Sequence, residues 1–245
     1  MKHLKYLFSG LFAIVLVLQS CSINQFTSSI KGNKTIIQEE ISISNYSAID
    51  LSVPGKVIYQ QTKGEGSYLQ IKVDENILPL IDITVKNNCL TIKAKDNENI
   101  DPSMLTITTN SRDLDRINLS GSGTIHLTGK INTNNMNVSI SGSGDIISDD
   151  LHSESIDLKV TGSGNATLNG TGKTARFSVT GSGDIHAYNY QVQKGHCRVT
   201  GSGDVYTHAT ESLNASVTGS GDIKYKGNPQ TDNRITGSGN IKQIK

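Results

Sequence analysis

Seven copies of a Ser/Thr-Gly-Ser-Gly motif are the strongest candidates for chemistry in this 245-residue chain. Glycine-rich loops bind phosphate where they join a strand to the first turn of a helix. No helical pattern follows any of the seven copies. Asp or Asn follows the second glycine in six copies, but only four of these residues are Asp. Because Ca²⁺ needs about six to eight oxygen ligands, we predict a structural motif without metal or cofactor, and keep a calcium-binding column as the alternative.

The acidic residues that could catalyse hydrolysis form one local cluster, Asp149, Asp150 and Glu154. Glycoside hydrolysis needs two opposed carboxylates, whereas this cluster falls between two predicted strands, where solvated charge is usual. His126 and His186 share one outward repeat position, but they are two or more coils apart, which argues against a shared metal ion. We therefore predict a protein that is not an enzyme, with a polysaccharide-acting enzyme as the least favoured alternative.

The motif recurs at a period that is typical of a solenoid or a propeller. Its copies begin at Ser120, Ser141, Thr161, Thr180, Thr200, Thr218 and Thr236. The steps between them are 21, 20, 19, 20, 18 and 18 residues. Apolar residues recur two and four positions before the first glycine and four positions after it, with polar residues between them. A propeller blade needs about forty residues, so we predict an all-β fold, a right-handed parallel β-helix (β-solenoid) with coils of about 20 residues.

Glycine is expected at the corners of the coils because it adopts positive φ and tolerates a crowded backbone. The turn-forming glycines are Gly121, Gly123, Gly142, Gly144, Gly162, Gly164, Gly181, Gly183, Gly201, Gly203, Gly219, Gly221, Gly237 and Gly239. The Asp or Asn after each motif is expected to accept a hydrogen bond from its own turn. Asn233 takes an inward position in the last copy, which predicts that this coil forms an end of the stack.

The region before the repeats, Ile36 to Thr109, also shows the period-two alternation of strands. Trp is absent and aromatic residues make up 5% of the chain, so Ile, Val and Leu must form the core. A net charge of +1 without a basic patch indicates no nucleic-acid surface. Cys89 and Cys197 show no motif spacing. We predict two buried free thiols, with a disulfide as the alternative.

The N-terminus has the pattern of an exported lipoprotein. Residues 1–5 are basic, residues 6–18 are apolar but too few to span a bilayer comfortably, and Leu18-Gln-Ser-Cys21 matches a bacterial lipobox. We expect cleavage before Cys21 and a lipid anchor on that residue. The predicted divisions are a lipoprotein signal peptide (1–20), a polar tether (21–34), an N-terminal irregular β segment of the solenoid (35–113) and a regular repeat solenoid (114–245).

The repeats, with Tyr46-Ser-Ala-Ile-Asp-Leu-Ser-Val53 and Leu90-Thr-Ile-Lys-Ala94 before them, resemble the auto-transporter adhesin "head GIN domain" family. These are secreted or lipid-anchored β-helical proteins common in Bacteroidetes. The resemblance covers about Tyr46 to the C-terminus. It implies a solenoid that continues through both halves of the chain, and it supplies no catalytic residues.

These observations predict a non-enzymatic cell-envelope protein, an outer-membrane lipoprotein held in the membrane by its lipid anchor. Its outward columns would bind a glycan or another envelope or surface protein, and no nucleic acid. Surface-exported lipoproteins of these bacteria tend to carry acidic residues after the lipidated Cys, whereas Ser22-Ile-Asn-Gln25 has none. The membrane face therefore stays open, as does the oligomeric state. A periplasmic scaffold or a stress-related envelope factor is the alternative.

Overall fold

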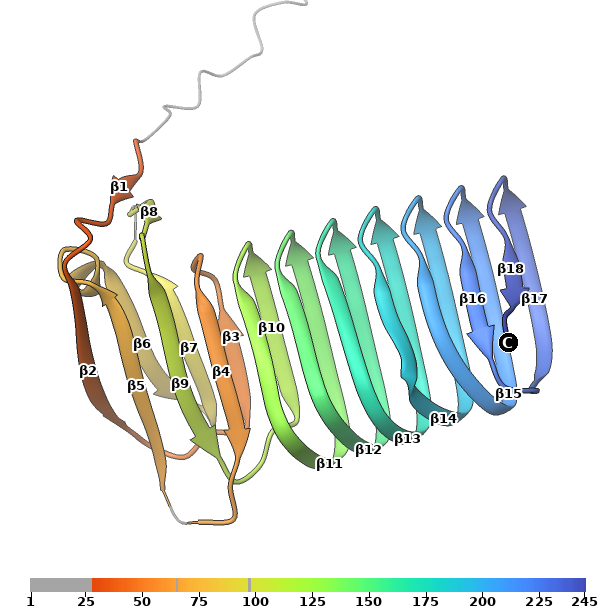
Figure 1. Cartoon of the computed structure of the whole chain (residues 1–245), viewed down its shortest axis with the longest axis horizontal. Coiled ribbons are helices and arrows are strands. Elements are labelled where there is room, and N and C mark those ends of the chain that lie inside the picture. Colours follow the sequence, from red (N-terminus) through yellow and green to blue (C-terminus); the bar gives the residue numbers. More distant parts are fainter. Residues whose placement is uncertain (1–27, 65, 97) are drawn as a thin grey trace, which may run out of the picture.

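The computed structural model describes residues 28–64, 66–96 and 98–245. Their regular structure is β, apart from one 3-10 turn at Leu78–Leu80. Figure 1 shows a row of stacked coils, formed by strands β10 to β18, with strands β1 to β9 at one end. The β-solenoid predicted from the repeat is confirmed. The predicted signal peptide and Cys21 lie outside the described residues.

The strands of the stack pair in parallel, each with its equivalent in the next coil. They are β10 (Arg116–Gly121), β11 (Thr124–Gly142), β12 (Asp145–Gly162), β13 (Asn165–Gly181), β14 (Ile185–Gly201), β15 (Val205–Gly219), β16 (Ile223–Lys226), β17 (Gln230–Gly237) and β18 (Ile241–Gln243). Ile140, for example, pairs with Val160, and Val160 pairs with Val179. Each predicted column is therefore a row of neighbours about 4.8 Å apart.

The middle coils are single continuous strands, so the acidic cluster that was predicted to fall between two strands lies inside one. β11 has 19 residues and β15 has 15. The chain turns at Gly-Ser-Gly and turns again where the strand itself bends, at residues 128–135 of β11 and their equivalents, which we call the second bend. Leu127 pairs with Ser148 but Lys130 pairs with Asp150, so one residue drops out of register there. Unequal coil lengths are absorbed at the second bend while the corners stay aligned.

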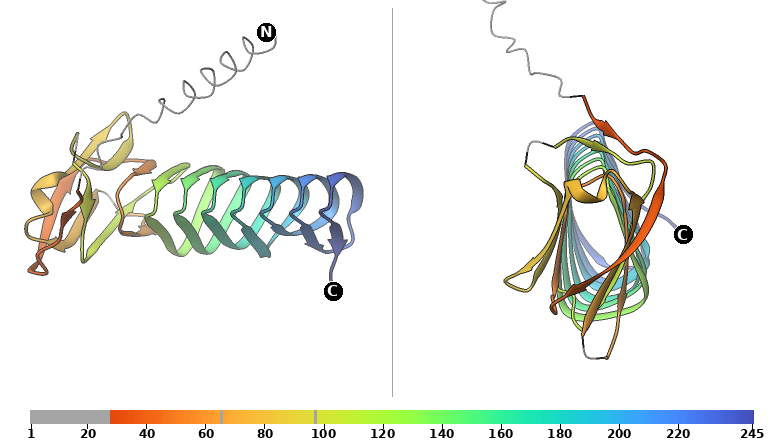
Figure 2. Two further views of the ribbon diagram at one scale, coloured as in Figure 1. Left: turned by 90° about the horizontal axis from the view of Figure 1, so that it is seen from above. Right: turned by 90° about the vertical axis from the view of Figure 1, so that its left-hand side faces the viewer.

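The coils enclose a flat core between two sheet faces (Figure 2). The pre-motif face consists of the residues that lead into each corner, such as 137–141. The post-motif face consists of those that follow a corner, such as 145–148. Inward side chains of both faces are buried, including Phe177 and Val199 on the first face and Ile185 on the second. One coil alone buries little apolar surface, so the core depends on stacking.

The last coil leaves its inward column uncovered. Every residue of β17 is exposed, and Ile235 keeps 48% of its surface accessible although its column is buried in the coils before it. Asn233 is exposed as well. Within the described residues β17 pairs only with β15, as expected for the end of a stack.

The N-terminal strands extend both faces and then reverse direction. They are β1 (Ile30–Lys31), β2 (Ile36–Ile43), β3 (Ala48–Leu51), β4 (Lys56–Gln61), β5 (Ser67–Asp74), β6 (Ile81–Lys86), β7 (Cys89–Ala94), β8 (Ile100–Asp101) and β9 (Leu105–Ser111). Parallel pairing continues from β11 to β4 and β9, and from β10 to β3 and β7. Beyond these strands, β5 with β9, β2 with β5 and β6 with β7 pair antiparallel. The solenoid that the resemblance extended through both halves therefore gives way to antiparallel pairing.

A buried carboxylate connects the segment before β2 to the loop before β9. Asp74 is inaccessible to solvent. Its oxygens accept hydrogen bonds from the backbone N–H groups of Lys34 (2.7 Å), Ser103 (2.8 Å) and Met104 (3.2 Å), and from the Ser103 hydroxyl (2.6 Å). Burial opposes ionisation, but these bonds outweigh it and hold the pKa of Asp74 below its ordinary value.

Both described cysteines, Cys89 and Cys197, are buried and free, which confirms the first of the two alternatives. Cys197 lies in an inward column beside apolar side chains. Its burial raises the pKa of the thiol to about 12. A thiol that is hardly ionised at neutral pH is a poor nucleophile, so Cys197 acts as a core residue.

Candidate ligand-binding groove

The predicted turn glycines lie at the corners and fall into two kinds. The first glycine of each motif has a positive φ, from 91° at Gly121 to 126° at Gly219, which other residues rarely adopt. The second glycine is needed for close approach. A Cβ on Gly203 would overlap the carbonyl oxygen of Gly183 in the preceding coil and lie 2.9 Å from a methyl group of Val179.

The Asp and Asn residues after the motif bond to the next coil rather than to their own turn, which corrects the prediction. Oδ1 of Asp184 accepts a hydrogen bond from the backbone N–H of Asp204 (2.7 Å), and Oδ1 of Asp204 accepts one from Asp222 (2.8 Å). Asn165 and Asn240 continue this ladder. The column thus joins coils through side chains. Within the described ranges, no group of three or more His, Cys, Asp or Glu side chains is placed to hold a metal ion.

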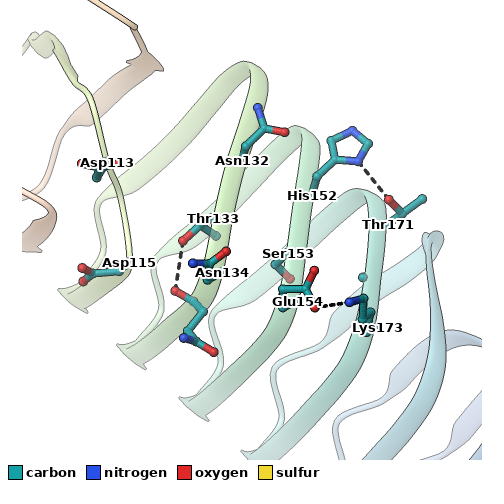
Figure 3. Close-up of a pocket in the computed structure, with 12 residues that line it drawn as sticks. Asp113, Asp115, Asn132, Thr133, Asn134, His152, Ser153, Glu154, Thr171 and Lys173 are labelled. Carbon is teal, nitrogen blue, oxygen red and sulfur yellow. Dashed lines mark hydrogen bonds and ion pairs between the residues drawn. The ribbon is translucent and has the colours of Figure 1, made fainter.

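A polar groove of 730 Å³ runs along the second bend (Figure 3). It is lined by residues 132–135 of β11, 152–154 of β12 and 171–173 of β13, together with Asp113 and Asp115 of the loop before β10. Asn132 pairs with His152 and His152 pairs with Thr171, so three successive coils contribute side chains at equivalent positions. Amides, hydroxyls, carboxylates, an imidazole and an ammonium group therefore face one open space.

Some lining groups are held in place by one another. His152 Nδ1 lies 2.9 Å from the Thr171 hydroxyl, and its Nε2 lies 2.8 Å from a carboxylate oxygen of Asp150. Lys173 Nζ and Glu154 form an ion pair at 2.5 Å. Two of these three contacts connect β12 with β13 and the third joins two residues of β12, so the groove presents oriented polar groups.

Four other lining side chains are uncommitted. Asp113, Asp115, Asn132 and Asn134 make no side-chain hydrogen bond or ion pair within the described part of the chain. Asn134 lies on β11, and the two aspartates lie on the loop at the end of the groove (Figure 3). Their donors and acceptors are free for a ligand.

The acids considered for catalysis lie within β12 and not in a loop, and each has a basic partner. Asp149 lies 2.8 Å from His126 Nε2 and accepts a longer hydrogen bond from the backbone of Gly129. The hydrogen bond from His126 lowers the pKa of Asp149, against the smaller opposing effect of burial. A general acid needs a raised pKa, so Asp149 is poorly suited to that role. Asp150 and Glu154 are engaged in the pairs described above.

A stack of side chains occupies the post-motif face at the outward position of His126 and His186. The rings of His186 and Tyr206 are stacked at 4.9 Å with an interplanar angle of 15°. Lys224 Nζ lies 5.2 Å from the Tyr206 ring centroid and within 3.4 Å of both Asp204 and Asp222. His126 and His186 were predicted to share a position, and the structure adds that Tyr206 occupies this position in the coil after His186 and contacts it. Tyr206 has a neighbour on each ring face and offers no open ring face to a ligand.

The groove was not predicted from the sequence. Its residues lie at the second bend, where coil lengths differ and the repeats cannot be aligned by counting from the motif. The available signal was Asn132-Thr-Asn-Asn135, an unbroken run of hydrogen-bonding side chains inside a strand-rich repeat. A ligand site in a repeat protein commonly lies on such an irregular edge.

The chain belongs to the family described as "Putative auto-transporter adhesin, head GIN domain", which it matches over residues 45–229. Membership of this adhesin family indicates a cell-surface or envelope protein. No protein with a curated description matches the chain. Among the described residues, no helix is long and apolar enough to cross a membrane.

Solved structures of proteins from Bacteroides fragilis and Parabacteroides distasonis share the fold. A protein from Bacteroides fragilis described as a "putative adhesin" is 30% identical, with a TM-score of 0.82, and the match covers 88% of this chain and 100% of that one. A "putative lipid binding protein" from Parabacteroides distasonis is 29% identical, with a TM-score of 0.73 and coverage of 89% and 100%. A second Parabacteroides distasonis protein, also described as a "putative adhesin", is 28% identical, with a TM-score of 0.72 and coverage of 88% and 100%.

Proposed function

We propose that this protein is a non-enzymatic, lipid-anchored envelope adhesin that binds a polymeric glycan in the groove at the second bend. The observation that carries the proposal is the combination of oriented polar groups with the uncommitted side chains of Asp113, Asp115 and Asn134. Sugar hydroxyls both donate and accept hydrogen bonds, so a mixed lining of amides and carboxylates suits them. Equivalent positions on successive coils suit a ligand that is itself a repeating chain.

A binding role is favoured over catalysis by the state of the acidic residues. Asp149, Asp150 and Glu154 are each engaged with a basic side chain. Retaining and inverting hydrolases both need one protonated and one ionised carboxyl group facing the substrate. The adhesin descriptions of the family and of two of the solved relatives also support a binding protein.

The lipid-binding description of one relative suggests a different ligand, an acyl chain. Acyl chains bind in sites lined mainly by apolar side chains. The groove is lined almost entirely by polar residues, which favours a hydroxyl-rich ligand.

Binding is tested with the full-length protein in detergent on glycan arrays and in polysaccharide pull-downs. The double variant Asp115→Asn, Asn134→Ala should lower the affinity for the bound glycan by about 3- to 10-fold, as expected for the loss of one or two hydrogen bonds. Asn189→Ala is the matched control, because Asn189 is an exposed asparagine that does not line the groove. Absence of any glycan binding above background would contradict the proposal.

The anchor is tested separately in cells. Cys21→Ser should abolish incorporation of labelled fatty acid and release the protein from the membrane fraction. Protease treatment of intact cells then distinguishes the two envelope faces, since a surface adhesin is cleaved and a periplasmic scaffold is protected. Protection of the wild-type protein would support the scaffold alternative.

A further inference from the structure

Basic side chains gather on the outward side of the pre-motif face in the later coils. Arg176, His196, Arg198 and Arg234 occupy two adjacent columns, and we call them the arginine site. Arg176 pairs with His196 in the strand ladder, and Arg198 and Arg234 are two coils apart in the neighbouring column, with Ser216 between them. All three arginines are exposed.

The arginines of this site have no acidic partner. No carboxylate of the described ranges lies within 4.0 Å of Arg176, Arg198 or Arg234. The nearby acids are engaged elsewhere: Asp232 accepts a hydrogen bond from Asn214 at 3.0 Å, and Asp157 lies 3.5 Å from Lys159. Three guanidinium groups therefore keep all their donors available.

Two recesses give the site its shape. One of 350 Å³ is lined by Arg176, Lys194 and His196, among others. The other, of 280 Å³, includes His196, Arg198 and Arg234. His196 lines both, so the two recesses adjoin at its imidazole.

The electrostatic field at this point is positive. Burial lowers the pKa of His196, and the charges of Arg176 and Arg198 lower it further. The surroundings have the same sign: residues 161–245 contain nine basic and five acidic side chains, whereas residues 113–160 contain three basic and seven acidic ones. The stack thus changes from acidic to basic along its axis.

We propose that the arginine site binds the carboxylate, sulfate or phosphate groups of an acidic polysaccharide. The planar guanidinium group matches such oxyanions with two parallel hydrogen bonds. The recess at Arg176 continues directly from the polar groove, since Glu154 and Lys173 line the groove and the next residues, Ser155 and Thr174, line the recess. One polymer can therefore contact both. This inference rests on the proposed glycan binding and specifies that the glycan is anionic.

The first test measures binding of the full-length protein in detergent to polygalacturonate and to uncharged dextran. The double variant Arg176→Gln, Arg198→Gln should bind polygalacturonate about tenfold more weakly than wild type, as for the loss of charged hydrogen bonds, and with a shallower salt dependence. Lys72→Gln, at an exposed lysine of β5 in the N-terminal region (Figure 1), should change neither. Equal affinity for dextran and polygalacturonate would overturn the inference.

The variants separate this inference from the proposed function. If Asn134→Ala weakens polygalacturonate binding and the arginine variant does not, glycan binding stands and the arginine site is wrong. If the protein binds no glycan at all, the proposed function is wrong, and the inference that rests on it is wrong as well. Binding to vesicles that contain phosphatidylglycerol, without binding to polygalacturonate, would overturn the inference, because it would show that the arginine site binds a membrane surface and not a polysaccharide.

A second measurement does not depend on affinity. The groups around His196 are Arg176, Arg198, Lys194 and Asn214, and the acids Asp157 and Asp232 each line one of the two recesses with it. An anion bound among them should raise the pKa of His196, which NMR titration of its imidazole reports with and without a galacturonate oligomer. An unchanged His196 titration would overturn the proposal, and His186, on the opposite face, is the internal control.

Discussion

The stack and most of the N-terminal region belong to one sheet, but different contacts stabilise them. In the stack, each corner repeats one set of backbone bonds, such as that from Ser202 N–H to the Gly181 carbonyl at 2.8 Å. In the N-terminal region, hydrogen bonds from individual buried side chains hold the segments together instead. Asp74 joins two segments, and the Tyr46 hydroxyl lies 2.8 Å from that of Thr109. Stability is distributed over equivalent contacts in one region and concentrated in particular residues in the other.

The difference follows from strand direction. Parallel coils of similar length place the same residue type beside itself, so the same corner geometry and the same backbone hydrogen bonds recur in all coils. Antiparallel strands such as β2 and β5 place unlike residues together, and each junction needs its own hydrogen bonds. A substitution should therefore spread its effect along the stack, but remain local in the N-terminal region.

The largest effect is expected where the stack is most crowded. Gly203→Ala places a methyl group against the Gly183 carbonyl and Val179. Because neither backbone can move without disturbing the next coil, we expect a loss of about 3 kcal/mol or more in unfolding free energy. Chemical denaturation followed by circular dichroism measures this loss.

Gly121→Ala is the matched control for this prediction. Gly121 has a positive φ of 91°, but a Cβ there would meet no atom within 4 Å. Only backbone strain applies, about 1–2 kcal/mol. Equal losses of unfolding free energy for the two variants would show that crowding between coils is not the reason for glycine at the second position of the motif.

An intermediate, local effect is expected from Asp74→Asn. The folded pKa of Asp74 is lowered, so its stabilising contribution is complete above the unfolded carboxyl pKa of about 3.9 and is lost as pH falls through the folded pKa. In wild type, hydrogen exchange at the Lys34 and Met104 amides should therefore accelerate below about pH 4. The variant should exchange rapidly at these amides already at neutral pH, while the Ser202 amide in the stack stays protected. Uniform acceleration across both regions would contradict the comparison.

The smallest effect is expected in the aspartate ladder. Asp204→Ala removes the acceptor for the Asp222 N–H and for the Tyr206 hydroxyl, and should cost about 1 kcal/mol. Asp204→Asn should stay within about 0.5 kcal/mol of wild type, because Asn165 accepts the same kind of bond from the next coil. Thermal unfolding compares the two variants. A larger loss for Asn than for Ala would show that the charge, and not the acceptor, matters.

Much of the stack could be predicted from the sequence because its columns are local and periodic. Ile140, Val160 and Val179 share a position relative to the motif, and they are neighbours in the structure. The partner of each ladder side chain could not be predicted in this way. Asp204 can reach either its own turn or the next coil, and only the stacking of the coils decides between them.

The candidate groove and the arginine site depend on relations between coils that the motif does not fix. The outward positions of Arg176 and Arg198 follow from the alternation, but the lack of acidic partners depends on where Asp157 and Asp232 point. At the second bend, register shifts break the correspondence between repeats, so Asn134 could not be placed beside residues of the next coil. Antiparallel pairing at the N-terminal end was missed because alternation alone does not specify strand direction.

The register shifts at the second bend also bear on how such proteins diversify. A coil can gain or lose one residue there without moving the glycine corners or the buried columns, as the pairings of Leu127 and Lys130 show. The groove lies on this same edge. Small insertions and deletions can thus reshape the groove while the corners and buried columns are conserved, so members of the family can differ at this edge on one scaffold.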